Sequence, residues 1–131
     1  MNHFHHAHLF AADIEVSLAF YCGVLGGKVV LDVDMAGARN VFVTLGRGRL
    51  HFYDQPPHDA GRGAVHHLGI QVDDLEALVE KMKAAGVSFR KPIADFGLWK
   101  YIMAPAPDGV LLELFEVDVE QVPDELREYF F

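Results

Sequence analysis

The feature that most constrains this sequence is an internal repeat at an offset of 61 residues. A His-His pair opens each copy, first as His5-His6 and then as His66-His67, and an aspartate follows the second histidine by seven positions in both copies. Self-similarity at a fixed period indicates a duplicated supersecondary unit, and such units bury their apolar faces by packing together. The chain is therefore expected to contain two copies of one folded unit.

Each copy predicts the element order βαβββ. In each copy a short apolar strand is followed by a helix. Because aspartate is a good N-cap residue, the first helix is expected to begin at Asp13 and the second at Asp73 or Asp74. Glycines suited to helix C-termini follow, at Gly26-Gly27 and at Gly86. The strand-like stretches after the helices are Lys28–Asp34, Asn40–Leu45 and Arg49–Asp54 in the first copy, and Ser88–Ala94, Trp99–Ala104 and Val110–Val117 in the second. The predicted fold class is α+β.

The chain length of 131 residues suits one compact domain. We expect a single domain over residues 1–131, with the first unit at about 3–54, a linker rich in Pro, Gly and polar residues at 55–63, and the second unit at about 64–118. The acidic tail at 119–131 is expected to contain a short helix that starts near Pro123 and ends in Tyr129-Phe130-Phe131.

Composition excludes several partners and environments. The net charge is −8 with histidine neutral, and no basic cluster is present, which argues against nucleic acid and anionic membranes as partners. The single cysteine, Cys22, cannot form an internal disulfide. No apolar run approaches the length of a transmembrane helix. These features favour a soluble cytoplasmic protein.

Residues with metal-binding side chains occupy equivalent places in the two copies. Alternation along a strand puts His6 and His8 on one face of the first strand, and places His67 on the matching face of its repeat. If the units pair about a pseudo-twofold axis, His67 becomes the mate of His6, and Glu113 becomes the mate of His51. Two imidazoles and a carboxylate, with His51 as a possible fourth ligand, suit a divalent transition metal.

Simpler interpretations stay open for the same residues. A histidine on a strand is more often packed or hydrogen-bonded than bound to metal. Glu113 lies in an apolar run, where a carboxylate needs a partner, so an ion pair with Lys100 or Arg90 is the alternative to a metal. His5 and His66 are expected to point away from the ligands, toward the helices.

The chain resembles the vicinal oxygen chelate superfamily, which includes glyoxalase I, methylmalonyl-CoA epimerase, extradiol dioxygenases and bleomycin-binding proteins. The matching segments are His5-His6, Asp13-Ile14-Glu15, Phe20-Tyr21, Leu25-Gly26, His66–Ile70, Asp74–Glu76 and Pro107–Leu114. The resemblance implies a cup-shaped mixed sheet of two paired βαβββ units with helices on its outer face. It also implies metal ligands at His6, His67 and Glu113, whereas His51 departs from the Glu or Gln of glyoxalase I and the epimerase.

Three functions are compatible with this resemblance. The first is a glyoxalase-like lyase or isomerase that binds vicinal oxygens of a small substrate, with Glu113 or His8 transferring a proton and Tyr101 orienting the substrate. The second is an Fe(II)-dependent ring-cleaving dioxygenase, although Met103 occupies the position of the dioxygenase tyrosine and Tyr101 lies two residues earlier. The third is a non-catalytic module that binds a small molecule or antibiotic.

The implied cofactor is a divalent metal ion, with Fe, Zn, Ni, Mn and Co all possible because ligand type alone does not select among them. A homodimer is the expected assembly from the resemblance. The aromatic C-terminus is expected to contribute to that interface or to a lid over the cup.

Overall fold

The computed structural model describes residues 1, 3–59 and 65–131. The chain divides into two compact units, one formed by Met1–Gly61 with Pro107–Gly109 and the other by Arg62–Ala106 with Val110–Phe131. Residues 60–63 of the expected linker, and residue 64 at the expected start of the second unit, lie outside the described residues. Among the described residues, no helix is long and apolar enough to span a membrane.

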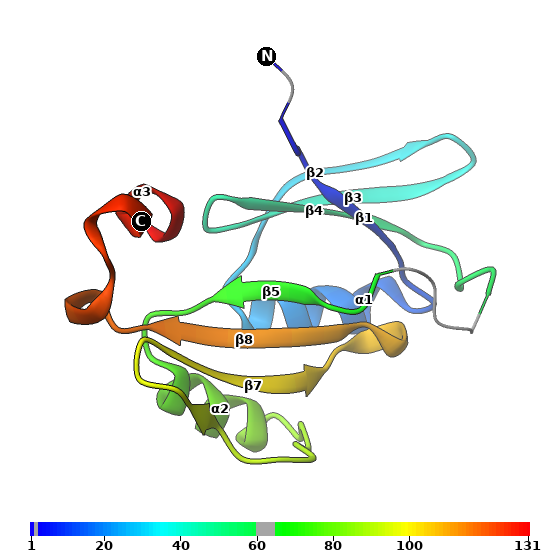
Figure 1. Cartoon of the computed structure of the whole chain (residues 1–131). Coiled ribbons are helices and arrows are strands. Elements are labelled where there is room, and N and C mark those ends of the chain that lie inside the picture. Colours follow the sequence, from blue (N-terminus) through cyan, green and yellow to red (C-terminus); the bar gives the residue numbers. More distant parts are fainter. Residues whose placement is uncertain (2, 60–64) are drawn as a thin grey trace. The chain divides into compact units, whose positions relative to one another are not determined.

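The first unit is a four-stranded mixed sheet with one helical segment (Figure 1). Its elements are β1 (Ala7–Phe10), α1 (Ile14–Leu18), a π-helical stretch (Ala19–Val24), β2 (Lys28–Met35), β3 (Ala38–Leu45), β4 (Gly48–Tyr53) and a 3-10 turn (Pro107–Gly109). The strand order is β1-β4-β3-β2, with β1 parallel to β4 and the other pairs antiparallel. Tyr21 packs on Phe52 with ring centroids 5.1 Å apart, so the helical segment covers the Phe52 face of the sheet.

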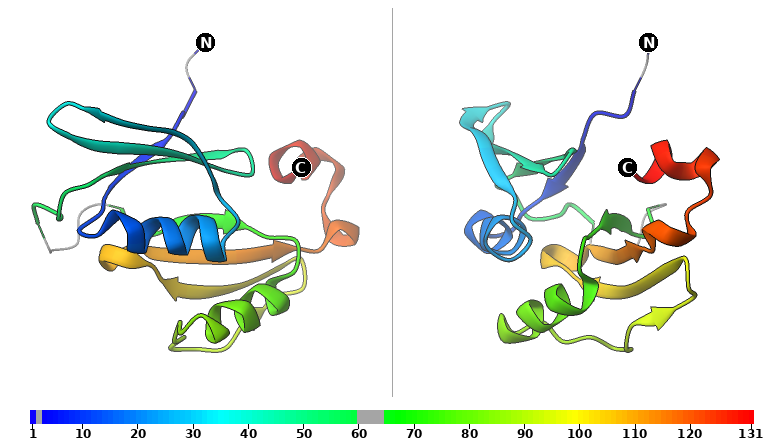
Figure 2. Two further views of the ribbon diagram at one scale, coloured as in Figure 1. Left: turned by 180° about the vertical axis from the view of Figure 1, so that it is seen from behind. Right: turned by 90° about the vertical axis from the view of Figure 1, so that its left-hand side faces the viewer.

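The second unit repeats this arrangement. Its elements are β5 (Leu68–Gln71), α2 (Leu75–Ala84), β6 (Ala94–Asp95), β7 (Trp99–Pro105), β8 (Leu111–Val117), 3-10 turns at Val119–Gln121 and Asp124–Leu126, and α3 (Arg127–Phe130). The strand order is β5-β8-β7-β6, and β5 is parallel to β8. Helix α2 buries Leu75, Val79 and Met82. Helices α2 and α3 lie on opposite sides of this sheet (Figure 2).

The strand registers confirm that the chain contains two βαβββ units. His8 of β1 pairs with His51 of β4, and Gly69 of β5 pairs with Glu113 of β8. Because His8 and Gly69 are related by the sequence repeat, their partners are also related. His51 and Glu113 are therefore structural equivalents, as the alignment of the two copies predicts.

The helix boundaries follow their capping residues. The Asp13 carboxylate accepts hydrogen bonds from the backbone N–H groups of Glu15 and Val16, and the Asp74 carboxylate accepts one from Ala77. The second helix thus begins after Asp74 rather than Asp73. It ends before Gly86, whose φ of +92° is a conformation that favours glycine. The short helix predicted after Pro123 is also present.

One predicted strand is wrong. The stretch Ser88–Ala94 is irregular, and only Ala94–Asp95 pairs with β7. Pro92 explains much of this difference, since proline has no N–H to contribute to a strand ladder. The π-helical continuation of α1 was not predicted either, because the apolar spacing of Leu18, Tyr21 and Leu25 does not distinguish it from a regular α-helix.

Candidate metal centre

The first unit gathers three histidines at one end of its sheet. The ring of His6 stacks on that of His51, with centroids 3.7 Å apart, and the Phe42 ring stacks on His51 at the same distance. His5 lies beside them, with its Nδ1 3.0 Å from Nδ1 of His6. Each of the three histidines offers a ring nitrogen within 4.8 Å of the others, a spacing that permits a shared metal ion.

Two further side chains extend the same face. His8 stacks on Tyr53 at 4.3 Å, and Phe10 lies 6.5 Å from the same tyrosine ring. His8 and Phe10 therefore share a face of β1, as alternation predicts, and His6, just before the strand, contacts His51 on the same side.

Two histidines on this face, His51 and His8, have lowered pKa values. Burial of the ring, followed by the neighbouring His6, His8 and His5, lowers the pKa of His51 to about 4. Burial and then His6 also lower the pKa of His8. A neutral imidazole keeps a lone pair on one nitrogen, and this is the form that binds a metal. The packing therefore favours metal binding over protonation in the first unit.

The second unit pairs a histidine with a carboxylate. Nε2 of His67 lies 3.1 Å from Oε2 of Glu113, and the exposed side-chain fractions are 33% and 17%. The indole Nε1–H of Trp99 donates a hydrogen bond of 3.1 Å to the other carboxylate oxygen, Oε1. One oxygen of Glu113 is thus held by the indole, while the other faces the imidazole.

The alternative ion pair of Glu113 with Lys100 or Arg90 is wrong. Lys100 instead pairs with Glu76 at 2.9 Å and with Glu116 at 3.3 Å. Glu116 is three residues further along β8, so it lies on the opposite face of the strand from Glu113. The partner of Lys100 on β8 is therefore Glu116 and not Glu113.

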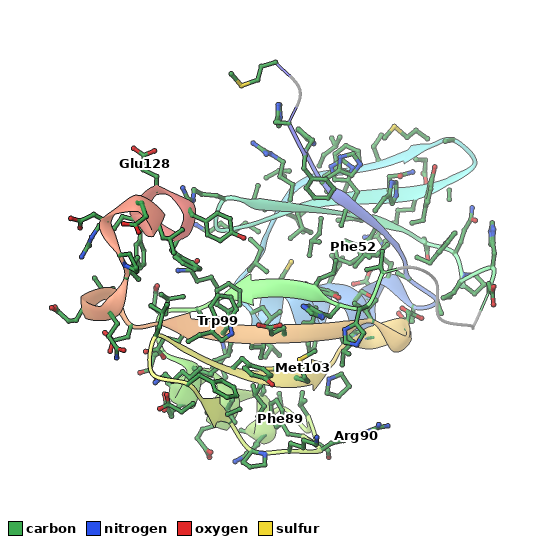
Figure 3. All side chains as sticks on the ribbon, in the orientation of Figure 1. Phe52, Phe89, Arg90, Trp99, Met103 and Glu128 are labelled. Atoms are coloured by element: carbon green, nitrogen blue, oxygen red, sulfur yellow. The ribbon has the colours of Figure 1, made fainter. Side chains whose placement is uncertain are left out.

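A cavity of about 350 Å³ lies beside the His67–Glu113 pair. It is lined by His67, Gly69, Gln71, Trp99, Glu113, Phe115, Tyr129 and Phe130. The indole of Trp99, labelled on β7 in Figure 3, stacks on Phe115 at 3.9 Å and meets the edge of Phe130 at 5.9 Å. The aromatic tail therefore forms part of the cavity wall.

Tyr101 does not belong to that wall. It pairs with Phe115 across the sheet and stacks on Phe96 at 6.1 Å, and it is absent from the residues that line the cavity. Met103 pairs with Glu113 itself, and Figure 3 labels it on β7.

The expected orientation of His5 and His66 is wrong. Both are exposed, and each approaches the second histidine of its own pair, with Nδ1 to Nδ1 distances of 3.0 Å and 2.8 Å. Strand alternation does not reach these residues, because β1 begins at Ala7 and β5 at Leu68. Sequence reasoning missed their contact for this reason, although their adjacency to the expected ligands was a signal.

The residues of the second unit fit a divalent metal. Nε2 of His67 and Oε2 of Glu113 are 3.1 Å apart, a distance at which either a proton on Nε2 or a cation bound by both atoms can lie between them. Two donors bound to one ion at about 2.0–2.2 Å stand roughly 3–3.5 Å apart, depending on the angle between them, and this range includes the observed spacing. Imidazole nitrogen with carboxylate oxygen is also a donor set that zinc and neighbouring transition metals accept.

The chain matches one known protein superfamily over most of its length. Residues 3–114 match the model of the Glyoxalase/Bleomycin resistance protein/Dioxygenase superfamily. The chain belongs to this superfamily. Its fold confirms the resemblance drawn from the repeat, since solved structures of the superfamily share the α+β arrangement of two four-stranded mixed sheets with helices.

Two relatives and one solved structure with a similar fold are informative. It is 28% identical over 126 residues to "Uncharacterized protein YaeR" of Escherichia coli, covering 86% of this chain and 94% of the relative. It is 29% identical over 133 residues to human mitochondrial methylmalonyl-CoA epimerase, covering 87% of this chain and 73% of the relative. A mutant of the fosfomycin resistance protein FosX from Listeria monocytogenes, solved with Mn(II) and 1S,2S-dihydroxypropylphosphonic acid, has a TM-score of 0.74 at 20% identity, covering 98% of both chains.

Proposed function

We propose that this chain is a glyoxalase-like metalloenzyme that binds vicinal oxygens of a small substrate and catalyses proton transfer of the lyase or isomerase type. The observation that carries the proposal is the His67–Glu113 pair, whose Nε2 and Oε2 atoms lie 3.1 Å apart, a spacing suited to a shared cation, and whose side chains line a cavity. The superfamily includes metal-dependent members, and the epimerase among the relatives of this chain is an isomerase by name.

The proposed ligands are His6 and His51 of the first unit and His67 and Glu113 of the second. When bound, the metal would act as a Lewis acid that polarises substrate oxygens and stabilises the negative charge formed on loss of a carbon-bound proton. Fe, Zn, Ni, Mn and Co all remain candidates. The Mn(II) and the diol of the FosX structure belong to that protein, and they support the choice of a divalent ion and an oxygen-rich ligand here.

Two side chains are candidates to carry the proton. Glu113 holds a carboxylate oxygen at the cavity, and its other oxygen is fixed by Trp99, which limits the directions in which it can accept a proton. His8 is neutral because its pKa is lowered by burial and by His6, so it can accept a proton at neutral pH. Tyr101 remains a candidate for orienting the substrate, although the described cavity does not include it.

The test separates metal binding, proton transfer and passive binding. Protein prepared without a tag or chelator would be analysed for metal, loaded with each candidate ion, and incubated in D2O with carbon acids that carry adjacent oxygens. We expect deuterium to enter the carbon next to the chelating oxygens in the wild type, and a Glu113→Gln variant to lose this exchange. Tight binding of a compound that is recovered without deuterium would contradict the enzymatic proposal and favour a binding module.

The proposal treats residues 1–131 as one functional domain of a cytoplasmic homodimer. Sedimentation at micromolar concentration is expected to give twice the monomer mass, and a purely monomeric species would contradict the dimer.

A further inference from the structure

The two His-His pairs share one geometry that strand structure does not impose. In the first pair the Nδ1 atoms of His5 and His6 are 3.0 Å apart, with ring planes at 87°. In the second pair the Nδ1 atoms of His66 and His67 are 2.8 Å apart, with ring planes at 82°. Neighbours in a regular strand would point to opposite faces, so a contact between neighbouring rings that recurs in both copies needs its own explanation.

Hydrogen-bond chemistry allows one arrangement that serves a metal. A neutral imidazole carries a proton on one nitrogen and a lone pair on the other. Nε2 of His67 is the atom that faces Glu113, so its lone pair must be free when a metal is bound there, and the proton must sit on Nδ1. The Nδ1–H of His67 then donates to Nδ1 of His66, which accepts.

We propose that His5 and His66 are positioning residues that accept the Nδ1–H hydrogen bond of His6 and His67, and so present Nε2 of each to the metal. This inference rests on the proposed function, since it assumes that His6 and His67 are ligands. It goes beyond that function because it assigns a common role to the first histidine of each pair. Acceptors of this kind fix the ring orientation and the tautomer of a metal-bound histidine.

A competing role for His5 is that of a ligand, because its ring nitrogen lies close to those of His6 and His51. The repeat argues against this role. Among the described residues, His66 belongs to no comparable group of three metal-binding side chains, yet it makes the same Nδ1 contact. The role that His5 and His66 can share is therefore that of accepting a hydrogen bond from the neighbouring histidine.

The test measures Zn²⁺ affinity by competition with a chromophoric chelator, using the full chain. Loss of such an acceptor weakens metal binding by about 10- to 100-fold. We expect this loss for His5→Ala and for His66→Ala. His5→Asn and His66→Asn should restore most of the affinity, because the amide oxygen can accept in place of Nδ1. The exposed His58 gives a matched control, and His58→Ala should bind Zn²⁺ as the wild type does.

Nitrogen-15 NMR of the Zn²⁺-loaded protein supplies a readout that general structural damage would not mimic. We expect slowly exchanging Nδ1–H signals from His6 and His67, and loss of only the His67 signal in His66→Ala. Wild-type Zn²⁺ affinity in both alanine variants would overturn the inference while leaving the proposed function intact. Complete loss of binding in His5→Ala, without rescue by asparagine, would make His5 a ligand and overturn its positioning role. A wild type that binds none of the five candidate ions would contradict the proposed function itself.

Discussion

The two copies of the βαβββ unit have kept one backbone plan and diverged in the chemistry of the fourth strand. In the first unit that strand carries His51, which is stacked between His6 and Phe42. In the second it carries Glu113, which faces His67 and accepts a hydrogen bond from Trp99. The first unit therefore offers only imidazole nitrogens as candidate ligands, whereas the second offers an imidazole and a carboxylate. Equivalent positions of the duplicated unit therefore carry side chains of unlike chemistry.

The largest expected effect on metal affinity comes from removing the two candidate ligands of the second unit, His67 and Glu113. Metal-binding free energies of about 10–16 kcal/mol shared among four ligands give roughly 3 kcal/mol each, or about 100-fold in affinity. A His67→Ala, Glu113→Gln double variant should lose metal by more than this factor, because it removes two donors and the charge. Isothermal titration with Zn²⁺ would measure the change. Wild-type affinity in this variant would show that the second unit does not bind the ion.

A second prediction concerns the fourth strand of the first unit, where His51 can be replaced by the residue type that the second unit carries. His51→Glu introduces the side chain of the second unit into the first, and His51→Ala removes the donor. We expect His51→Ala to lower the affinity by about 100-fold and His51→Glu to recover much of it, since glutamate can also bind a divalent ion. Equal affinities for the wild type and both variants would exclude His51 as a ligand.

A smaller effect is expected at the indole that holds the carboxylate. Trp99→Phe keeps an aromatic ring against Phe115 but removes the N–H that binds Oε1 of Glu113. Such neighbours of a ligand contribute about 10- to 100-fold to metal affinity. The same titration applies, and Trp99→Phe should lie between the wild type and the Glu113 variants. An affinity as low as that of Glu113→Gln would indicate that the whole cavity had rearranged.

The smallest effect is a pH dependence of stability in metal-free protein. Folding lowers the pKa of His51 to about 4 from 6.5, so the unfolded chain binds a proton first as the pH falls. Stability should decrease from pH 6.5 toward pH 4 and level off below that. Because the ring keeps some contact with solvent, we expect a loss of about 1–2 kcal/mol rather than the full value of the shift.

Urea denaturation in the presence of a chelator would measure this loss, with His51→Phe as the control that keeps the stack on Phe42. The difference in stability between the wild type and His51→Phe should change with pH over this range. A constant difference would show that His51 titrates alike in the folded and unfolded chain.

Much of the fold was predictable because the repeat and the local signals agree. The sequence predicts the aspartate cap at Asp13 and narrows the second cap to Asp73 or Asp74, and the equivalence of His51 and Glu113 follows from aligning the copies. Local consistency of this kind makes an element predictable. The strand predicted at Ser88–Ala94 is wrong because its apolar residues resemble those of a strand, whereas Pro92 prevents regular pairing.

The candidate site was less predictable where it depends on contacts between strands. The bond from Trp99 to Glu113 joins residues 14 positions apart on neighbouring strands, and it depends on a register that apolar periodicity does not define. The contact of His66 with His67 depends on where β5 begins, and strand boundaries are the least certain part of a sequence interpretation. The repeat therefore predicts the candidate ligands, whereas the residues that hydrogen-bond to them, such as Trp99 and His66, are seen only in the structure.

The central claim is that the unlike halves supply His6, His51, His67 and Glu113 to a divalent metal. Elemental analysis of untagged protein, combined with X-ray absorption at the edge of the metal found, tests it most directly. The account predicts about one ion per chain, bound by nitrogen and oxygen with the scattering pattern of several imidazoles, and loss of that pattern in the His67→Ala, Glu113→Gln variant. Protein that holds no metal and takes up none of the five candidate ions would contradict it.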